Sequence, residues 1–307
     1  MPVAAIDIGT NTTRLIVAEV SGSSLEELDR RTTITRLGEG VDESGRLSTA
    51  GVERVFETLA GYFEIVETND AGPALAFATS AVRDASNGGD FLREVENRFG
   101  FRVRLLSGNE EALLAFRGAT IGRTLMGSVL VVDIGGGSTE LVLGDLAGPS
   151  FHVSLNIGAV RLTERHLHGD PPTPAELDHC TASVRELLLE RIPTGVLHAP
   201  GAAIGNAGTI TTIAALDQGL QVYDRGRVHG YSIPRRAVDE QLARLAALPL
   251  SERRLVPALE PERAPVIVAG AIVCRELLDV FGLEAIEASE LDILDGAALL
   301  AAESPSS

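Results

Sequence analysis

The stretch Val131–Leu143 constrains the fold of this chain more than any other. It reads VVDIGGGSTELVL, an apolar β-branched run, three consecutive glycines, two hydroxyl residues and a second apolar run. Glycine adopts backbone angles that are closed to other residues, so the pattern predicts a strand, a tight turn and a second strand. Bare glycine amides also form a cradle for an anion. The stretch therefore predicts a β-hairpin with an anion site at its turn.

Two carboxylates flank the glycine turn, Asp133 before it and Glu140 after it. Carboxylates beside a phosphate cradle repel a phosphate unless a hard cation such as Mg²⁺ lies between them. The hairpin is therefore predicted to bind phosphate with the help of a metal ion. The residues expected to contact phosphate at this turn are Gly135, Gly136, Gly137, Ser138 and Thr139.

The same pattern occurs at the N-terminus, in Ala4–Val17, where Asp7 aligns with Asp133. The difference lies at the second charged position, because Arg14 replaces Glu140 and offers a cation. The shared Asp-Ile-Gly and Thr-x-Leu argue against a chance similarity between two packing strands. The repeat predicts an α/β protein with a duplicated domain whose copies face each other across a cleft. The polar residues of the first turn, expected to contact phosphate, are Asn11 and Thr12.

Composition sets the class of protein. At 307 residues and 45% hydrophobic residues, the chain is long enough for two domains. A net charge of -17 argues against general binding of nucleic acid. The sequence has no apolar run of about 18 residues and no basic N-terminal region, which predicts neither a membrane span nor a signal peptide. Two isolated cysteines, Cys180 and Cys274, fit a reducing compartment, so we expect a cytoplasmic protein.

The order of expected elements in the first copy, βββαβαβα, is that of a ribonuclease-H-like domain. We predict an N-terminal domain over residues 1–122, a C-terminal ribonuclease-H-like domain over 123–303, and a frayed tail over 304–307. The last helix expected in the C-terminal domain covers Leu294–Ala302.

Two helix starts carry further candidates. Glu110 and Glu111 lie in the first turn of a predicted helix, where neighbouring side chains do not face alike, so one is expected to point inward. The alternative is structural, since a carboxylate is favoured at any helix N-terminus. The glycine-rich segment Gly205–Thr209 also runs into a helix, whose free amides could bind an anion.

Several motifs, in this order, resemble the exopolyphosphatase / guanosine pentaphosphate phosphatase (Ppx/GppA) family in a short two-domain form. They are Asp7–Leu15, Ala78–Arg83, Ser107–Ala112, Asp133–Glu140, Gly158–Glu164, Gly208-Thr209 and His229–Tyr231. The resemblance covers nearly the whole chain. That family belongs to the actin-like ATPase superfamily, in agreement with the duplicated hairpins.

The resemblance implies a role for each site residue. Glu111 corresponds to the general base that activates water. Asp133 and Glu140 correspond to metal- and phosphate-site carboxylates, to which we add Asp7, and Arg83 matches a phosphate-binding arginine. The further residues expected at the phosphates are Arg14, Gly208 and Thr209. The metal is expected to be Mg²⁺, with Mn²⁺ as the alternative.

These observations predict a cytoplasmic exopolyphosphatase that releases the terminal phosphate of inorganic polyphosphate. The alternatives are a guanosine pentaphosphate 5′-phosphohydrolase, an ATP-dependent kinase on the same fold, and a non-catalytic sensor of polyphosphate or guanosine tetraphosphate. Extra C-terminal helical domains found in many family members do not follow the core in this sequence, which predicts distributive action on short chains. The family's habit implies a homodimer, and no nucleic-acid or membrane partner is expected.

Overall fold

The computed structural model describes residues 2–22, 24–72 and 74–303, and the chain forms two compact units. Unit 1 combines Met1–Arg123 with Leu291–Ser307, and unit 2 is Thr124–Glu290. The predicted frayed tail, 304–307, lies outside the described residues. Each unit is described by itself.

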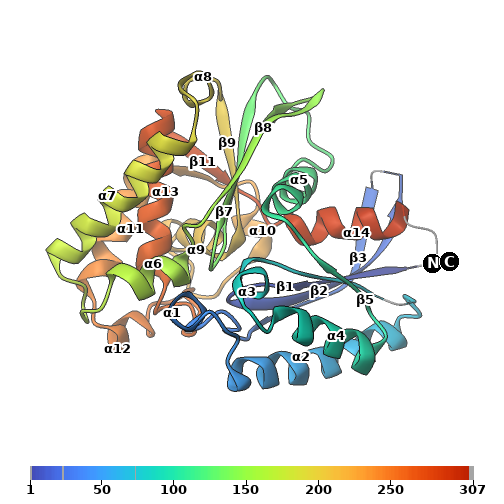
Figure 1. The fold of residues 1–307 in the computed structure, drawn as a ribbon. Helices are drawn as coiled ribbons and strands as arrows, with labels where there is room; N and C mark the ends of the chain where they lie inside the picture. The colour runs from blue at the N-terminus through green and yellow to red at the C-terminus, as the bar shows by residue number, and fades with distance from the viewer. Residues whose placement is uncertain (1, 23, 73, 304–307) are drawn as a thin grey trace. The chain divides into compact units, whose positions relative to one another are not determined.

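Unit 1 is built on a five-stranded sheet with the strand order β3-β2-β1-β4-β5 (Figure 1). The first three strands are antiparallel, and β4 and β5 run parallel to β1. The strands are β1 (Val3–Ile8), β2 (Thr12–Ser21), β3 (Ser24–Ile34), β4 (Leu75–Ala78) and β5 (Arg102–Leu105). This is the strand and helix order that the sequence predicts for a ribonuclease-H-like domain.

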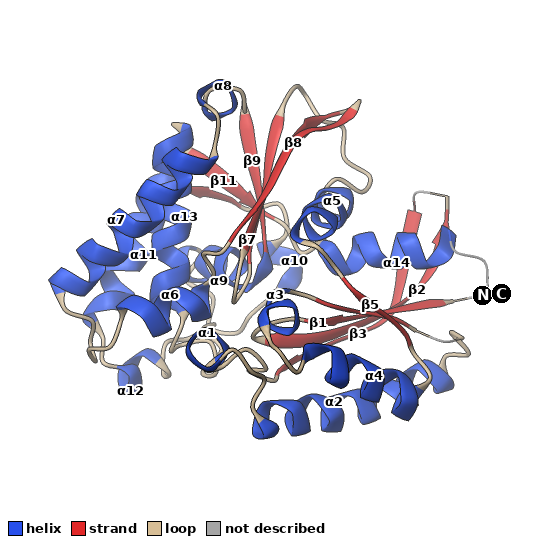
Figure 2. Cartoon of the chain, in the orientation of Figure 1, coloured by secondary structure: helices blue, strands red, loops and turns tan. Residues whose placement is uncertain are grey.

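Helices cover both faces of this sheet (Figure 2). One face packs against α2 and α4 through Ile6, Leu15, Leu59 and Phe91, and the other packs against α5 and α14. Alternate residues of each strand face opposite sides, which explains why β1 is buried along its length. The helices of unit 1 are α1 (Val41–Ser44), α2 (Thr49–Thr68), α3 (Ser80–Asp84), α4 (Gly88–Phe99), α5 (Gly108–Ala119) and α14 (Ile293–Glu303).

Unit 2 contains a six-stranded sheet with the order β10-β11-β9-β6-β7-β8. The strands are β6 (Val129–Ile134), β7 (Thr139–Asp145), β8 (Gly148–Leu155), β9 (Ala202–Asn206), β10 (Ser232–Pro234) and β11 (Ala285–Ala288). Its helices are α6 (Ala159–His166), α7 (Pro174–Arg191), α8 (Thr194–Leu197), α9 (Ala207–Asp217), α10 (Arg225–Val228), α11 (Arg235–Ala247), α12 (Leu250–Arg253) and α13 (Ile267–Phe281). One large apolar core joins the sheet to these helices, with α13 at its centre.

The two hairpins repeat each other in register. Asp7 lies opposite Arg14 in the first, and Asp133 lies opposite Glu140 in the second. Both turns close with the same backbone hydrogen bond of 3.0 Å, from Gly9 N–H to the Thr12 carbonyl and from the Gly135 N–H to the Ser138 carbonyl. The predicted duplication of the hairpin is confirmed.

The last helix departs from the predicted domain boundaries. Residues up to 303 were assigned to the second domain, but α14 packs on β1, β2 and α5 of unit 1. Two glycines permit this close packing, because a Cβ on Gly118 would lie 1.7 Å from the Asp292 carbonyl oxygen and one on Gly296 would lie 2.1 Å from the Leu114 carbonyl oxygen. Hydrophobic periodicity predicts such a helix but does not specify which sheet it covers.

Both cysteines are buried thiols without a disulfide, as expected from their isolation. Across residues 2–22, 24–72 and 74–303, no helix has the length and apolar character needed to cross a membrane.

Candidate active site

The candidate metal site of unit 2 is the carboxylate pair Asp133 and Glu140. Their neighbours Val132 and Leu141 face the apolar core, so the two carboxylates lie on the opposite face of the sheet. Both residues are buried, and Ser154 on β8 donates a 2.7 Å hydrogen bond to Glu140 Oε1. Like charges directly opposite each other destabilise a sheet. A divalent cation between them would remove this repulsion.

This pair fits Mg²⁺, which proteins usually bind through one or two carboxylates while water and substrate phosphates complete the coordination. Among the residues that the structure describes, no group of three or more His, Cys, Asp and Glu side chains is placed to hold a metal ion. Asp133 and Glu140 are therefore the residues that would hold it in unit 2.

The glycine turn, Gly135–Gly137, is fixed by the segment that begins α6. All three glycine carbonyl oxygens accept hydrogen bonds from that segment. The donors are the backbone N–H groups of Ala159, Val160 and Arg161 and the Arg161 guanidinium. A Cβ on Gly158 would lie 2.4 Å from the Gly136 carbonyl oxygen, so only glycine allows this approach. Because the carbonyl oxygens are engaged, they are less able to repel a phosphate at the turn.

The two hydroxyl residues of this turn are both buried. Thr139 donates its hydroxyl proton to the Ile157 carbonyl, so this hydroxyl stabilises the unit. The Thr139 hydroxyl is therefore engaged within the unit, and a phosphate contact through the Thr139 backbone amide stays a prediction. Ser138 closes the turn through its own carbonyl, which accepts the Gly135 N–H.

A third feature of unit 2 is the N-terminus of α9. Ala207 has φ 64°, a conformation that is uncommon for a residue with a side chain, and it turns the chain from β9 into the helix. The guanidinium of Arg263 lies against Gly208, the residue after Ala207. A Cβ on Gly208 would be only 1.7 Å from Arg263 Nη1. A cation is electrostatically unfavourable at a helix N-terminus, where anions are favoured. This end of α9 is therefore strongly suited to a bound anion.

Thr209, which the sequence also assigns to the phosphates, packs against α13. A Cβ on Gly270 would lie 2.3 Å from Thr209 Oγ1, so the glycine leaves space for this side chain. The structure therefore brings Gly208 to the positive end of α9 and directs Thr209 toward the helix packed beside it.

In unit 1 the start of α5 separates the two adjacent glutamates. Glu110 forms a capping box with Ser107 and pairs with Arg104 at the surface, and these contacts with Ser107 lower the pKa of Glu110. Glu111 is buried, with 5% of its side chain exposed. The sequence prediction that only one of the pair points inward is confirmed, and Glu111 is that residue.

Glu111 is held by Arg83, which follows β4 in the short helix α3. Arg83 Nη1 donates both to Glu111 Oε1 and, at 2.8 Å, to the Leu106 carbonyl. From the sequence, Arg83 was predicted to bind a phosphate and Glu111 to activate the attacking water. The structure joins these two residues directly.

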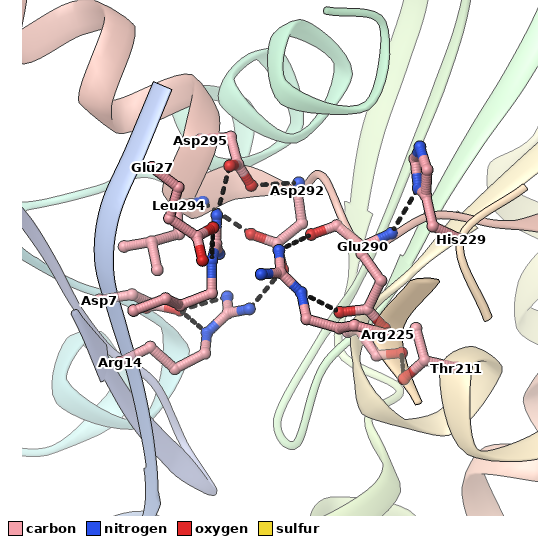
Figure 3. Close-up of polar contacts among 12 residues, drawn as sticks. Asp7, Arg14, Glu27, Thr211, Arg225, His229, Glu290, Asp292, Leu294 and Asp295 are labelled. Atoms are coloured by element: carbon pink, nitrogen blue, oxygen red, sulfur yellow. Dashed lines mark hydrogen bonds and ion pairs between the residues drawn. The ribbon is translucent and has the colours of Figure 1, made fainter. Parts of the chain in front are cut away.

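Arg14, which is partly buried, and the buried Asp7 form an ion pair at the first hairpin (Figure 3). Arg14 donates to Asp7 Oδ2 from Nε at 3.0 Å and from Nη2 at 2.6 Å, and it also pairs with Asp292 beside the start of α14. Burial raises the pKa of Asp7, and the Arg14 guanidinium offsets part of that effect. Within the described residues, Asp7 Oδ1 is buried without a hydrogen-bond partner. Arg14 therefore neutralises two carboxylates of its own unit, and Oδ1 is the Asp7 atom left to accept a ligand.

The other expected residues of this hairpin are Asn11 and Thr12. The Asn11 carbonyl accepts the Thr35 N–H at 3.0 Å and the Arg36 N–H at 2.9 Å, which ties the turn to the end of β3. The side chains of both turn residues are half-buried at the tip of the hairpin.

Two residues at the α9 end were not predicted as site residues. Arg263 lies 55 positions after Gly208, and only the fold brings them together. Asn206 is the residue before the α9 start, with its side chain fully buried. Asn206 lies within Gly205–Thr209, the segment that the sequence predicts to bind an anion. The predicted phosphate contacts in this segment were assigned to Gly208 and Thr209, and not to Asn206.

A duplicated hairpin with a glycine cradle, opposed carboxylates and a positive helix end are the features of an enzyme that acts on phosphate compounds. Residues 15–299 match the Ppx/GppA phosphatase family, and the chain belongs to that family. It is 39% identical to Exopolyphosphatase 2 of Mycobacterium tuberculosis over 97% of both chains. Among solved structures, it resembles the Aquifex aeolicus Ppx/GppA family member at 31% identity, with a TM-score of 0.83 and coverage of 100% and 99%. It also resembles an exopolyphosphatase from Cytophaga hutchinsonii at 25% identity, with a TM-score of 0.88 and 96% of both chains covered.

Proposed function

We propose that this phosphatase is an exopolyphosphatase that hydrolyses the terminal phosphate of inorganic polyphosphate with the help of Mg²⁺. The observation that carries the proposal is the pair of opposed carboxylates, Asp133 and Glu140, beside a glycine turn whose carbonyl oxygens are engaged elsewhere. A polyanionic substrate and a divalent cation together satisfy both features. The 39% identical Mycobacterium tuberculosis relative, named an exopolyphosphatase, supports this substrate class.

The proposed reaction is the attack of water on the terminal phosphorus. A new P–O bond forms from the water oxygen, and the bond from phosphorus to the bridging oxygen breaks. The products are inorganic phosphate and a polyphosphate that is one unit shorter. Mg²⁺ would neutralise charge on the phosphate oxygens.

Glu111 is the proposed general base, which accepts the proton of the attacking water. General bases typically contribute a factor of about 10²–10⁴ to the rate. Its burial beside Arg83 holds the carboxylate in one place. Arg83 is 26% exposed, so part of its guanidinium is accessible to a phosphate oxygen. The positive charge of Arg83 would thus hold the Glu111 carboxylate in place and also attract a phosphate oxygen of the substrate.

The test is phosphate release from tripolyphosphate, from long polyphosphate and from guanosine pentaphosphate, measured side by side with Mg²⁺. The proposal expects release from both polyphosphates, and it expects this release to be lost, or to need a higher Mg²⁺ concentration, with the Asp133→Asn variant purified in parallel. That variant controls for contaminating phosphatases. Release from guanosine pentaphosphate alone would instead assign the 5′-phosphohydrolase, and release from none of the three would contradict the proposal.

A further inference from the structure

Polar side chains form a continuous row across four strands of the unit 2 sheet. Asp133 on β6 is in register with Glu140 on β7 and with Asn206 on β9, and Glu140 is in register with Ser154 on β8. Residues in register share a face of the sheet, and neighbouring strands lie about 4.8 Å apart. Asn206 therefore flanks Asp133 on the side opposite Glu140. We call Ser154, Glu140, Asp133 and Asn206 the polar row.

Asn206 is a neutral member of this row, and its side-chain amide lacks hydrogen-bond partners among the described residues. Its residue is 0% exposed, and within the described part of the chain neither Oδ1 nor Nδ2 has a hydrogen-bond partner. It occupies the position before α9 without capping the helix through its side chain. A buried amide without partners destabilises the folded state, whereas an apolar residue of similar size would not. Its presence is explained if a ligand supplies the partners.

The surroundings of Asn206 specify what kind of ligand this is. The side chain follows the carboxyl end of β9, next to the metal-site carboxylate Asp133 and before the positive N-terminus of α9. At that N-terminus, the Arg263 guanidinium lies against Gly208. Carboxamide N–H groups donate hydrogen bonds to phosphate oxygens without adding charge. Arg263 also pairs with Glu260 at 3.2 Å, so the ligand is identified by the other two groups: an anion at the α9 end would satisfy the Asn206 Nδ2 donor and the helix N-terminus together.

We propose that Asn206 is a substrate-binding residue, whose Nδ2 donates to a non-bridging oxygen of the phosphate bound beside Asp133. The inference rests on the proposed function for the identity of the phosphate compound, but it concerns the binding of any phosphate group at this place. Asn206 makes the polar row a site with two carboxylates for a cation and one neutral donor for the anion.

The experiment compares Asn206→Ala and Asn206→Asp with the wild-type protein and with Gln218→Ala. Gln218 is a matched control at the other end of α9, where its side-chain amide donates to the carbonyls of Ala214 and Arg227. Thermal unfolding is measured with and without inorganic phosphate in the presence of Mg²⁺, and KM and kcat are measured for tripolyphosphate.

Without phosphate, we expect Asn206→Ala to unfold at the same temperature as the wild type or higher, because an unsatisfied amide is removed. The stabilisation by phosphate should be lost, and KM should rise on the order of tenfold or more, as for a hydrogen bond to a charged group. Asn206→Asp should raise KM further by adding a negative charge. Gln218→Ala should lower the unfolding temperature and leave the response to phosphate unchanged.

A wild-type response to phosphate and an unchanged KM in Asn206→Ala would overturn the inference, as would the absence of any phosphate response in the wild type. Neither of these two results would contradict the proposed hydrolysis if the protein still cleaves polyphosphate. Conversely, a phosphate response that depends on Asn206 in a protein that cleaves no polyphosphate supports the inference and contradicts the proposed function.

Discussion

Arg83 donates a hydrogen bond to Glu111 and a second one, from the same nitrogen, to the Leu106 carbonyl. The second contact anchors the guanidinium to the end of the β5 segment, so Arg83 can hold the Glu111 carboxylate in a defined place. The adjacent Glu110 instead caps the helix and pairs with Arg104 at the surface. Two glutamates of the same helical turn therefore lie in different environments, one buried beside an arginine and one at the exposed helix end.

We expect Glu111→Gln to lower kcat by about 10²–10⁴ with little change in stability or KM, since the amide keeps the shape but cannot accept the proton. Glu110→Gln should leave kcat near the wild-type value, because glutamine also forms a capping box. Steady-state kinetics on tripolyphosphate and thermal unfolding of both variants give the comparison. Equal and near-wild-type activity in the two variants would show that the base is another residue.

Removal of the metal should abolish activity, because the chain carries a net charge of -17 and places two carboxylates at the phosphate site. Activity should vanish in excess chelator and return with Mg²⁺. Asp133→Asn should abolish turnover or raise the Mg²⁺ requirement while stabilising the metal-free protein by about 0.2–1 kcal/mol, the range for cross-strand pairs. Titration of Mg²⁺ and urea unfolding measure the two effects, and full activity in chelator would refute the metal-assisted site.

Polyphosphate should be shortened distributively. Within each unit the candidate phosphate contacts are confined to a hairpin turn and helix ends, and each missing contact raises the chance of dissociation between cleavages. Per chain end, short chains should then be hydrolysed at least as efficiently as long ones. A gel time course with long chains in excess should show a smoothly shortening population. Fully degraded chains beside untouched starting material would demonstrate processive action.

Glu176 should make the stability of unit 2 depend on pH. Its carboxylate accepts the N–H groups of Thr173, His168 and Gly169, and these contacts lower the pKa of Glu176 to about 2. A lowered pKa in the folded state means that the stabilisation is complete above the ordinary value of 4.5 and is lost as pH falls toward 2.

Glu176→Gln should therefore be less stable than the wild type at pH 7, and the difference should shrink progressively below pH 4.5. Denaturant unfolding of both proteins between pH 7 and pH 3 measures this convergence. A difference that stays constant over this range would show that ionisation of Glu176 does not contribute.

Much of the fold could be predicted from local patterns in the sequence. The two hairpins, the Ser48 cap of α2 and the Gly100 end of α4 are set by residues within a few positions of each other. Helix geometry also predicted that Glu110 and Glu111 face different ways, and the family resemblance assigned the base to Glu111. These features depend on short-range stereochemistry, which a single sequence displays directly.

The partners of the charged residues could not be predicted in this way. Arg14 was expected to neutralise phosphate, but it pairs with Asp7 and with Asp292, which is 278 positions away. The approach of Arg263 to Gly208 likewise depends on how α9 and α13 pack. Side-chain charge predicts that a partner exists, whereas only the tertiary fold decides which one it is.

The placement of α14 on the first sheet has a consequence for synthesis on the ribosome. Unit 2 is one uninterrupted segment and is complete once Glu290 has left the exit tunnel, whereas unit 1 lacks one of its covering helices until Ile293–Glu303 has followed. Until then, α5 covers that face without α14, so apolar side chains in the same cluster as Leu294 and Ala298, such as Ile16 and Phe77, lack part of their cover. Vectorial synthesis thus completes the inserted unit before the unit that begins the chain.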